Sequence, residues 1–435
     1  MHPSMSTSLL VLALSCLAPM VLQAQSLSVE SRTPAGAYGN DINDGPRVTP
    51  DGRWVVFRSY ANNLVPGDTN NAPDTFVRDR QSGVITRVSV SSAGVQGNDF
   101  SYAGFPTADG RYIGFGSEAR NFAAGDTNGF IDAFLHDRQT GQTVCISTSP
   151  AGTPGDRASA FLGWAGDRFG LILSTSTNLV SGDTNNVQDG FAYDRQSATL
   201  TRVTLGPGGV QANHDTTSLA LSDDGRWVAF TSLASNLAPG DTNNRFDVFL
   251  HDRQSTDTLM LSRSASGAIG DANSGAVAIS ADGRYVAFSS SASNLVPGDS
   301  NGVNDIFLYD RLSGSLQRIS ELPGVQANGF SSAAHFTPDG GAVAFITAAT
   351  NLFPNDNNQR WDIVLRETSS GQIRLLSRGA GGVQGDADHG TGNFCAQRAC
   401  YVFSTSASNY AAGTPAGISQ VYYLSEDGLF ASGFE

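Results

Sequence analysis

Short runs of Val, Ile, Phe and Tyr alternate with turn-forming Gly, Asp, Asn and Ser along most of this chain. In Gly97–Ser149 the apolar residues gather in four short stretches. Runs of this kind, alternating or continuously apolar, are typical of β-strands. Asp-Gly pairs between them, such as Asp109-Gly110, are typical of two-residue hairpin turns. No segment of useful length after residue 25 has a helical pattern, so we predict an all-β protein built from four-stranded antiparallel units.

This four-stranded unit is copied in tandem. The phrase NLVPGDTNNAPDTFVRDRQSG, from Asn63, returns along the chain with its first Asp at positions 68, 126, 183, 241, 299 and 356, a spacing of 57 or 58 residues. A constant period means one structural unit repeated. With a degenerate last copy, the sequence predicts a seven-bladed β-propeller. The alternative is a flat solenoid, but solenoid repeats are usually shorter and rarely hold four strands.

The N-terminal segment supplies a strand that the last unit lacks. SLSVESRTPAGAYGND, from Ser26, matches TRVSVSSAGVQGND, from Thr86, which follows the third strand of another unit. We therefore expect Ser26–Ser31 to form the outer strand of the last blade and to close the ring. The expected propeller spans residues 25–427, followed by a C-terminal tail at 428–435.

Strand direction predicts which loops share a face. In an up-and-down blade, the first and third turns lie at one end, and the second loop and the crossover to the next blade lie at the other. The GDTNN loops and the Gly-rich crossovers, such as Ser91–Ser101, should therefore share one face. We expect this face to carry the function, because loops on a rigid scaffold usually do.

The N-terminus has the pattern of an export signal. Residues 8–22 form one apolar run that ends just before Ala24. This is typical of a secretory signal peptide spanning 1–24, and the run is too short to span a bilayer stably. The sequence thus predicts a periplasmic or secreted protein without a transmembrane span.

Charge and composition exclude several classes of function. The formal net charge of −14 disfavours binding to a nucleic-acid backbone. The chain contains no lysine, which excludes Schiff-base and phosphate-loop lysines. It contains no HExxH, Cys/His zinc or Gly-x-Ser-x-Gly motif either. We expect a monomer without catalytic residues of its own.

The repeated acidic loops are the strongest candidates for a site. Oxygen ligands at alternate positions suit Ca²⁺, which binds about six to eight oxygens. Alternatively, the Asp and Asn side chains fold the loop by bonding its backbone, and the second Asp fixes the start of the third strand. Both interpretations stay open, and Ca²⁺ is the only candidate cofactor. The candidate residues are Asp68, Asn70, Asp74, Asp126, Asn128, Asp132, Asp183, Asn185, Asp189, Asp241, Asn243, Asp247, Asp299, Asn301 and Asp305, with a weaker copy at Asp356, Asn358 and Asp362.

Repeated Asp-Arg pairs follow the third strands. Because the pair recurs, it indicates an inter-blade salt bridge or a turn anchor rather than catalysis. The pairs are Asp79-Arg80, Asp137-Arg138, Asp194-Arg195, Asp252-Arg253 and Asp310-Arg311.

The cysteines, histidines and irregular aromatic residues give weaker indications. Cys395 and Cys400 flank the turn in FCAQRACYVF, so we expect a disulfide across this hairpin. His136 and His251 share a repeat position with polar residues and are expected at the surface. Aromatic residues at non-equivalent positions are candidates for a sugar or peptide site. These residues are Trp164, Trp361, Phe130 and Phe246.

The repeats resemble the WD40-like (PD40) repeats of the TolB-type β-propellers. The resemblance rests on Asp282-Gly283-Arg284-Tyr285-Val286 and Asp310-Arg311, and it covers about residues 26–427. It implies a propeller that docks peptides and partner proteins on one face. We expect no α/β domain like the one that precedes the propeller in TolB itself, and hence a different exported bacterial protein.

Two functions follow from these observations. The first is a non-enzymatic exported module that binds a protein, peptide or glycan through the face rich in Asp and Asn. The alternative is a propeller enzyme, such as a polysaccharide lyase or hydrolase, with a site at the central channel. Symmetry separates them, because a catalytic site needs non-repeating polar residues at the channel mouth.

Overall fold

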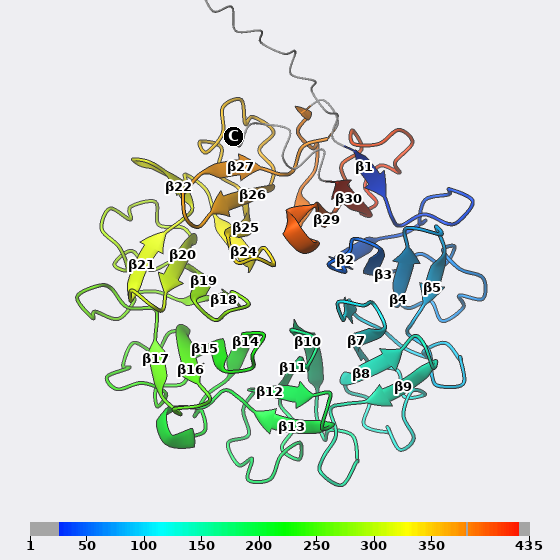
Figure 1. Ribbon diagram of the computed structural model, residues 1–435, viewed down its shortest axis with the longest axis horizontal. Coiled ribbons are helices and arrows are strands. Elements are labelled where there is room, and N and C mark those ends of the chain that lie inside the picture. Colours follow the sequence, from blue (N-terminus) through cyan, green and yellow to red (C-terminus); the bar gives the residue numbers. More distant parts are fainter. Residues whose placement is uncertain (1–25, 380–381, 426–435) are drawn as a thin grey trace, which may run out of the picture.

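The computed structural model describes residues 26–379 and 382–425. Seven four-stranded antiparallel sheets stand around a central axis, as Figure 1 shows. This confirms the seven-bladed β-propeller. The expected signal peptide at 1–24 and the tail at 428–435 lie outside the described residues.

Each blade runs from an inner strand beside the channel to an outer strand at the rim (Figure 1). Blade 1 contains β2 (Asn43–Val48), β3 (Trp54–Ser59), β4 (Asp74–Asp79) and β5 (Ile85–Arg87); blade 2 contains β6 (Phe105–Pro106), β7 (Tyr112–Ser117), β8 (Asp132–Asp137) and β9 (Gln142–Cys145). Blade 3 contains β10 (Ser159–Ala165), β11 (Phe169–Ser174), β12 (Asp189–Asp194) and β13 (Thr199–Arg202); blade 4 contains β14 (Thr216–Leu221), β15 (Trp227–Ser232), β16 (Asp247–Asp252) and β17 (Thr258–Met260). Blade 5 contains β18 (Ser274–Ile279), β19 (Tyr285–Ser290), β20 (Asp305–Asp310) and β21 (Ser315–Arg318); blade 6 contains β24 (Ser331–Phe336), β25 (Ala342–Thr347), β26 (Asp362–Glu367) and β27 (Ile373–Leu375). Blade 7 contains β28 (His389–Gly390), β29 (Cys400–Thr405), β30 (Gln420–Ser425) and β1 (Leu27–Val29).

Within residues 26–379 and 382–425, little regular structure lies outside the blades. A small hairpin of β22 (Glu321–Leu322) and β23 (Val325–Gln326) forms in the crossover from blade 5 to blade 6. Two single-turn 3₁₀ helices, η1 (Pro207–Gly209) and η3 (Ala396–Arg398), lie in the crossover from blade 3 to blade 4 and in the first turn of blade 7.

The N-terminal strand closes the ring as expected. β1 pairs antiparallel with β30, with Leu27 opposite Leu424 and Val29 opposite Tyr422. The pairing continues beyond β1, because the Glu30 amide donates to the Val421 carbonyl at 2.8 Å. Blade 7 is thus built from both ends of the described chain.

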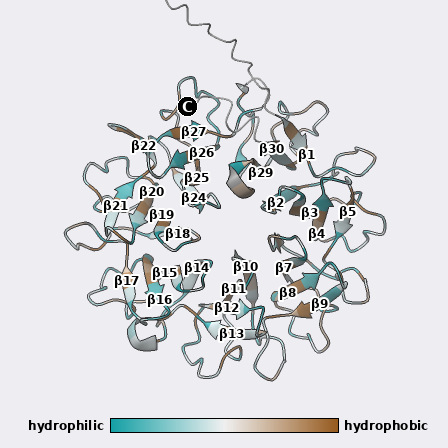
Figure 2. Ribbon diagram, viewed as in Figure 1, coloured by the Kyte–Doolittle hydropathy of each residue, from teal (hydrophilic) through white to brown (hydrophobic). Residues whose placement is uncertain are grey.

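Apolar side chains of the middle strands form the core between blades. Figure 2 shows hydrophobic segments within the strands, and the fully buried residues include a Phe at the same two positions in most blades. These Phe residues face each other across the second and third strands. The rings of Phe230 and Phe249, for example, stack with centroids 5.5 Å apart. Truncating one such side chain to Ala costs about 3–5 kcal/mol.

The second loops and the crossovers lie on the same face, which we call the loop face. The evidence is contact: the Asn70 side chain of the blade 1 loop donates to the Gly97 carbonyl of the following crossover at 3.0 Å. The opposite face carries the first and third turns of each blade, and we call it the turn face. Two inner strands are short, since β6 and β28 cover two residues each.

Candidate functional site

The asparagine of each acidic loop holds the loop to the next crossover. In five of the six loops its Oδ1 also accepts the amide of the residue two positions on, as Asn128 does from Phe130 at 2.7 Å. This is the loop-folding role of such side chains. The six Nδ2 donors and their acceptors are Asn70 to Gly97, Asn128 to Gly155, Asn185 to Ala212, Asn243 to Gly270, Asn301 to Ala327 and Asn358 to Gly385, at 2.7–3.2 Å.

The second Asp of each loop begins the third strand and is almost completely buried. One carboxylate oxygen accepts a hydroxyl from the start of the crossover. Ser147 donates to Asp132 at 2.7 Å, and Ser262 donates to Asp247 at 2.5 Å. The first Asp of the loop lies close to the second: burial raises the pKa of the second Asp most, and the charge of the first Asp raises it further. Each loop therefore presents two neighbouring buried carboxylates.

At one outer-strand position next to this pair, the residue type alternates from blade to blade around the ring. It is the residue in register with the third residue of the third strand. Blades 1, 3 and 5 have an arginine there, and its side chain is only 7–8% exposed. Blades 2, 4 and 6 have an uncharged residue. The alternating residues are Arg87, Cys145, Arg202, Met260, Arg318 and Leu375 in blades 1 to 6.

The arginines bind both carboxylates of their blades. Arg202 lies 2.8 Å from Asp183 and 3.3 Å from Asp189. Arg87 and Arg318 bind the two carboxylates of blades 1 and 5 at 3.2–3.9 Å. These arginines recur in every second outer strand, so the alternation is present in the sequence. It can be recognised there only once the loop Asp pairs are known to face that strand.

The carboxylates of blades 2, 4 and 6 lack this guanidinium. Burial raises the pKa of Asp132, Asp247 and Asp362 to about 6. Burial also raises the pKa of Asp189 to about 6, although Arg202 opposes the shift. Within the described residues, no group of three or more His, Cys, Asp and Glu side chains has the geometry of a metal centre. A cation here would need main-chain oxygen or water as well.

A second candidate site lies at the channel mouth on the loop face of blades 7, 1, 2 and 3. A cavity of about 440 Å³ is lined by Asp44, Arg58, Tyr102, Phe161 and Ser404 among others. Arg58 donates two hydrogen bonds to Asp44, at 2.8 and 2.6 Å.

The adjoining tyrosine makes a second polar pair. The Tyr102 hydroxyl donates to Glu118 at 2.6 Å, and burial together with this carboxylate raises the pKa of Tyr102 to about 12. The positions of Asp44 and Arg58 hold Thr217 and Thr231 in blade 4, so the polar pairs do not repeat. Sequence analysis missed them because Asp44 and Arg58 meet only through the pairing of β2 with β3.

Exposed apolar side chains gather on the loop face. Twelve large hydrophobic residues of the described chain are exposed. Eight of these lie in loops of this face, and their side chains are therefore available to a partner. The eight are Ile42, Tyr60, Val95, Phe100, Phe130, Val210, Val325 and Val383.

The aromatic candidates separate into two groups. Phe130 is 45% exposed at the tip of an acidic loop. Trp361 packs on Phe330, with ring centroids 5.3 Å apart. Trp164, in contrast, has a structural role, because its Nε1 donates to the Phe105 carbonyl of the neighbouring blade at 2.9 Å.

The turn face is held by charged side chains that satisfy each other. The Asp of each repeated Asp-Arg pair anchors the turns of its own blade: Arg53 donates to Asp79 at 3.0 and 3.1 Å. The Arg of the pair instead reaches an aromatic ring of the preceding blade. Arg138 of blade 2 lies over Trp54 of blade 1, for example. Both parts of the pair are thus structural, with different partners.

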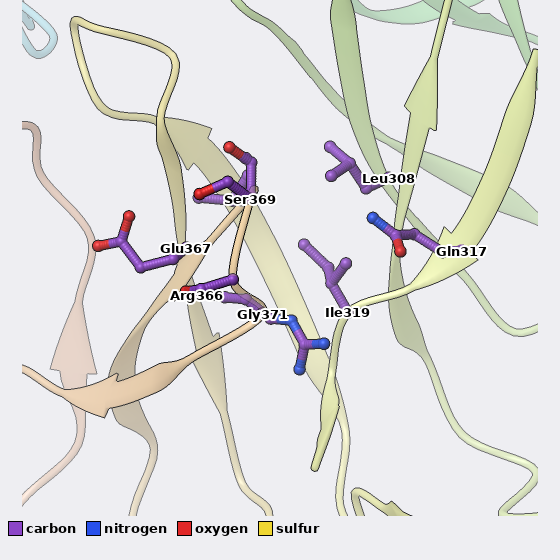
Figure 3. Close-up of a pocket in the computed structure, with 10 residues that line it drawn as sticks. Leu308, Gln317, Ile319, Arg366, Glu367, Ser369 and Gly371 are labelled. Carbon is purple, nitrogen blue, oxygen red and sulfur yellow. The ribbon is translucent and has the colours of Figure 1, made fainter. Parts of the chain in front are cut away.

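A cleft of about 240 Å³ opens between blades 5 and 6, where this arrangement is interrupted. Figure 3 shows Leu308, Gln317 and Ile319 of blade 5 on one side of it and the β26–β27 turn on the other. In this turn Glu367 and Thr368 replace the repeated Asp-Arg pair. We therefore attribute the cleft to the missing inter-blade arginine and not to a cluster of reactive groups.

The histidines named below lie in three different blades and do not form a common site. His136 and His251 are buried, in contrast to the surface position expected, and each bonds to a threonine of its own outer strand at 2.9 Å. His389 is buried in blade 7 beside Tyr410. The sulfur atoms of Cys395 and Cys400 are bonded, with Cα atoms 5.3 Å apart, and Cys145 is a free thiol.

Comparisons with known proteins show the fold alone. No family model matches the sequence, and no curated protein matches it. The β-propeller domain of the Trilobed protease from Pyrococcus furiosus, which has an open velcro topology, is 11% identical with a TM-score of 0.51, over 88% of this chain and 95% of that one. An oligogalacturonate lyase in complex with manganese is 12% identical with a TM-score of 0.51, over 92% and 96%. A TolB protein from Agrobacterium tumefaciens is 13% identical with a TM-score of 0.37, over 88% and 90%.

In the part of the chain that the structure describes, no helix has both the length and the apolar character needed to cross a membrane.

Proposed function

We propose that this protein is an exported, monomeric and non-catalytic binding module whose loop face takes a protein, peptide or glycan partner. One observation carries the proposal: eight of the twelve exposed large hydrophobic side chains lie in the loops of that face. Exposed apolar side chains that lie together mark an interaction surface, and loops on a rigid scaffold usually carry binding.

The channel mouth of blades 1 and 2 is the proposed centre of this surface. Ile42 and Phe100 occupy the same repeat position in adjacent blades and are 44% and 40% exposed. Tyr60 lies beside Ile42, since the Tyr60 amide donates to the Ile42 carbonyl at 2.9 Å. The cavity lined by Asp44 and Arg58 opens next to them. Apolar side chains around a polar pair favour a polypeptide over a glycan, because they suit a partner with both apolar and charged groups.

An array of peptides and glycans, probed with the purified protein, tests the proposal. Binding is expected to weaken at least about tenfold, roughly 1.4 kcal/mol, when Ile42 and Phe100 are both changed to Ser. The matched control is Leu312→Ser, because Leu312 is 67% exposed on the turn face. Equal binding by the double variant and the control would contradict the proposed surface. A glycan as the only ligand would reject the preference for polypeptides.

The alternative, a propeller enzyme, would use the same cavity. Its polar pairs, Asp44 with Arg58 and Tyr102 with Glu118, do not recur around the ring. Each pair is internally satisfied, which leaves no free base for catalysis and favours binding. Incubation with oligogalacturonate and Mn²⁺, the compound class in the name of one structural neighbour and the metal bound to it, tests the alternative. Cleavage that is lost in Arg58→Met would establish the enzyme.

A further inference from the structure

Three blades of the propeller bury a pair of carboxylates that make no ion pair in the described part of the chain. The pairs are Asp126 with Asp132, Asp241 with Asp247, and Asp356 with Asp362 in blades 2, 4 and 6. In each pair one buried oxygen has no hydrogen-bond partner: Asp126 Oδ1, Asp247 Oδ2 and Asp362 Oδ2. The residues that carry these oxygens are 6%, 0% and 1% exposed. Burying a carboxylate oxygen without a partner is unfavourable, so a missing partner is indicated.

The odd-numbered blades show what kind of partner fits. In blade 1 the Arg87 guanidinium lies 3.2 Å from Asp74 and 3.7 Å from Asp68. It also donates to the Gly67 carbonyl at 3.1 Å. A positive charge therefore occupies a space bounded by two carboxylates and one main-chain oxygen.

Blade 2 has the same loop backbone and no side chain to fill that space. Gly125 has a φ of +81°, close to the +73° of Gly67, so the two loops turn in the same way. Cys145 stands in the register position of Arg87 and is too short and uncharged to replace it. The space between Asp126 and Asp132 thus keeps its oxygen atoms and loses its cation.

The other groups facing these pairs do not supply the charge. Asn128 and Ser147 donate to Asp132, but both are neutral. In blade 4, Arg263 donates to the Met260 sulfur and the Pro239 carbonyl. It acts on the two carboxylates of that blade only from a distance, as Arg120 acts on Asp126 in blade 2, because the described chain shows no ion pair between them.

Blade 6 has a weaker neutral donor. Gln384 reaches Asp356 at 3.3 Å, and Arg378 acts on this carboxylate only from a distance, because the described chain shows no ion pair between them.

We propose that a hard divalent cation, for which Ca²⁺ is the probe, binds between the two carboxylates in each of blades 2, 4 and 6, and that an arginine takes its place in blades 1, 3 and 5. The carboxylate oxygens and the main-chain oxygen that bound the space are ligands that suit Ca²⁺. The ligands are the six carboxylates together with the loop carbonyl equivalent to that of Gly67, and water completes the shell.

This narrows the eighteen loop residues expected from the sequence, the weaker copy at Asp356, Asn358 and Asp362 included, to six carboxylates. The asparagines are not ligands, because their amide groups hold the loops and crossovers. The Asp pairs of blades 1, 3 and 5 bind arginine instead. Each cation would join the loop to the first residue of the third strand, and so would hold three of the six loops. The inference does not depend on the identity of the loop-face partner.

Calorimetric titration of chelator-treated protein with Ca²⁺ tests the assignment. Three equivalents should bind, with a rise in melting temperature. Cys145→Arg, which copies the odd-numbered blades, should bind two. The matched control Cys145→Leu, which copies blade 6, should bind three. A wild-type count other than three, or an unchanged count in Cys145→Arg, would overturn the proposal.

Two further variants keep the test independent of whether Cys145→Arg folds. Asp126→Asn keeps the size of the side chain and removes a ligand charge, so two equivalents are expected. Arg202→Met copies blade 4 and should create a fourth site. If Asp126→Asn still binds three equivalents, or Arg202→Met gains none, the arginine does not stand in for a cation.

Discussion

The Arg138 guanidinium of blade 2 lies 3.7 Å from the ring centre of Trp54 in blade 1. Arg53, from the turn before Trp54, approaches the same ring at 4.5 Å. The contact between blades recurs around the turn face. Its other members are Arg80 on Tyr423, Arg195 on Tyr112, Arg253 on Phe169 and Arg311 on Trp227.

Replacing Arg138 should therefore loosen the contact between blades 1 and 2. Arg138→Met keeps the aliphatic packing and removes the charge over the indole, and we expect a loss of about 1–2 kcal/mol. Urea denaturation measures it. The matched control is Arg157→Met, because Arg157 is exposed in a crossover. Equal stability of the two variants would show that the cation–π contact contributes nothing.

Removal of the N-terminal strand should destabilise the whole ring. A chain that begins at residue 33 leaves β30 without its outer partner and removes Glu30, which binds Arg78 at 3.0 Å and Arg80 at 3.2 Å. We expect a sharply lower melting temperature than for a chain that begins at residue 25. An unchanged melting temperature would mean that closure by β1 is not required for stability.

The guanidinium–carboxylate pairs of the turn face should make stability depend on acid pH. Hydrogen bonds from Arg53 lower the pKa of Asp79 to about 2, and Arg168 does the same for the pKa of Asp194. An unfolded Asp has a pKa of about 3.9. Because the folded pKa is depressed, the stabilisation is present above about pH 4 and is lost as the pH falls towards 2.

The Arg53 side chain is 43% exposed, so solvent screens the pair and its contribution should be small. Urea unfolding at several pH values measures the loss. The double variant Arg53→Met/Asp79→Asn should lose less stability between about pH 5 and 3 than wild type. The control Asp41→Asn alters an exposed carboxylate and should follow wild type. A steeper acid loss in the double variant would contradict this assignment.

The repeat allowed the architecture to be predicted, because a period of 57 or 58 residues carries four strands and their turns. The match of Ser26 with Thr86 identified β1 for the same reason: equivalent strands keep equivalent patterns. The contacts of residues that break the repeat were harder to predict from the sequence. Asp44 and Arg58 become a pair only when β2 and β3 are placed in register.

The acidic loops show a different limit. Six similar phrases suggested six similar sites, yet the neighbouring charge is decided by the outer strand, at Arg87 in blade 1 and Cys145 in blade 2. The partner of Asp79 was also not its neighbour Arg80 but Arg53, because antiparallel pairing brings the first and third turns together. Sequence proximity is therefore a poor guide to ion pairs in a blade.

Alanine substitutions at two glycines of blade 2 distinguish the cost of backbone strain from the cost of packing against Trp54. Gly110 and Gly141 lie in turns of the same face, with φ of +65° and +77°. A Cβ on Gly141 would meet nothing within 4 Å, whereas a Cβ on Gly110 would lie 2.3 Å from Cδ1 of Trp54. Gly141→Ala should thus cost only the strain of a positive φ, about 1 kcal/mol.

Gly110→Ala should cost more, because the Trp54 ring is also contacted by Arg138 and has to move or force the turn to move. Overpacking of this kind adds about 1–3 kcal/mol to the strain. Urea denaturation of both variants measures the difference. If Trp54→Ala is introduced as well, the extra cost of Gly110→Ala should disappear, while the cost of Gly141→Ala should stay. If Gly110→Ala and Gly141→Ala lose the same stability in the presence of Trp54, the indole can move without cost. Arg138 then does not hold it in place.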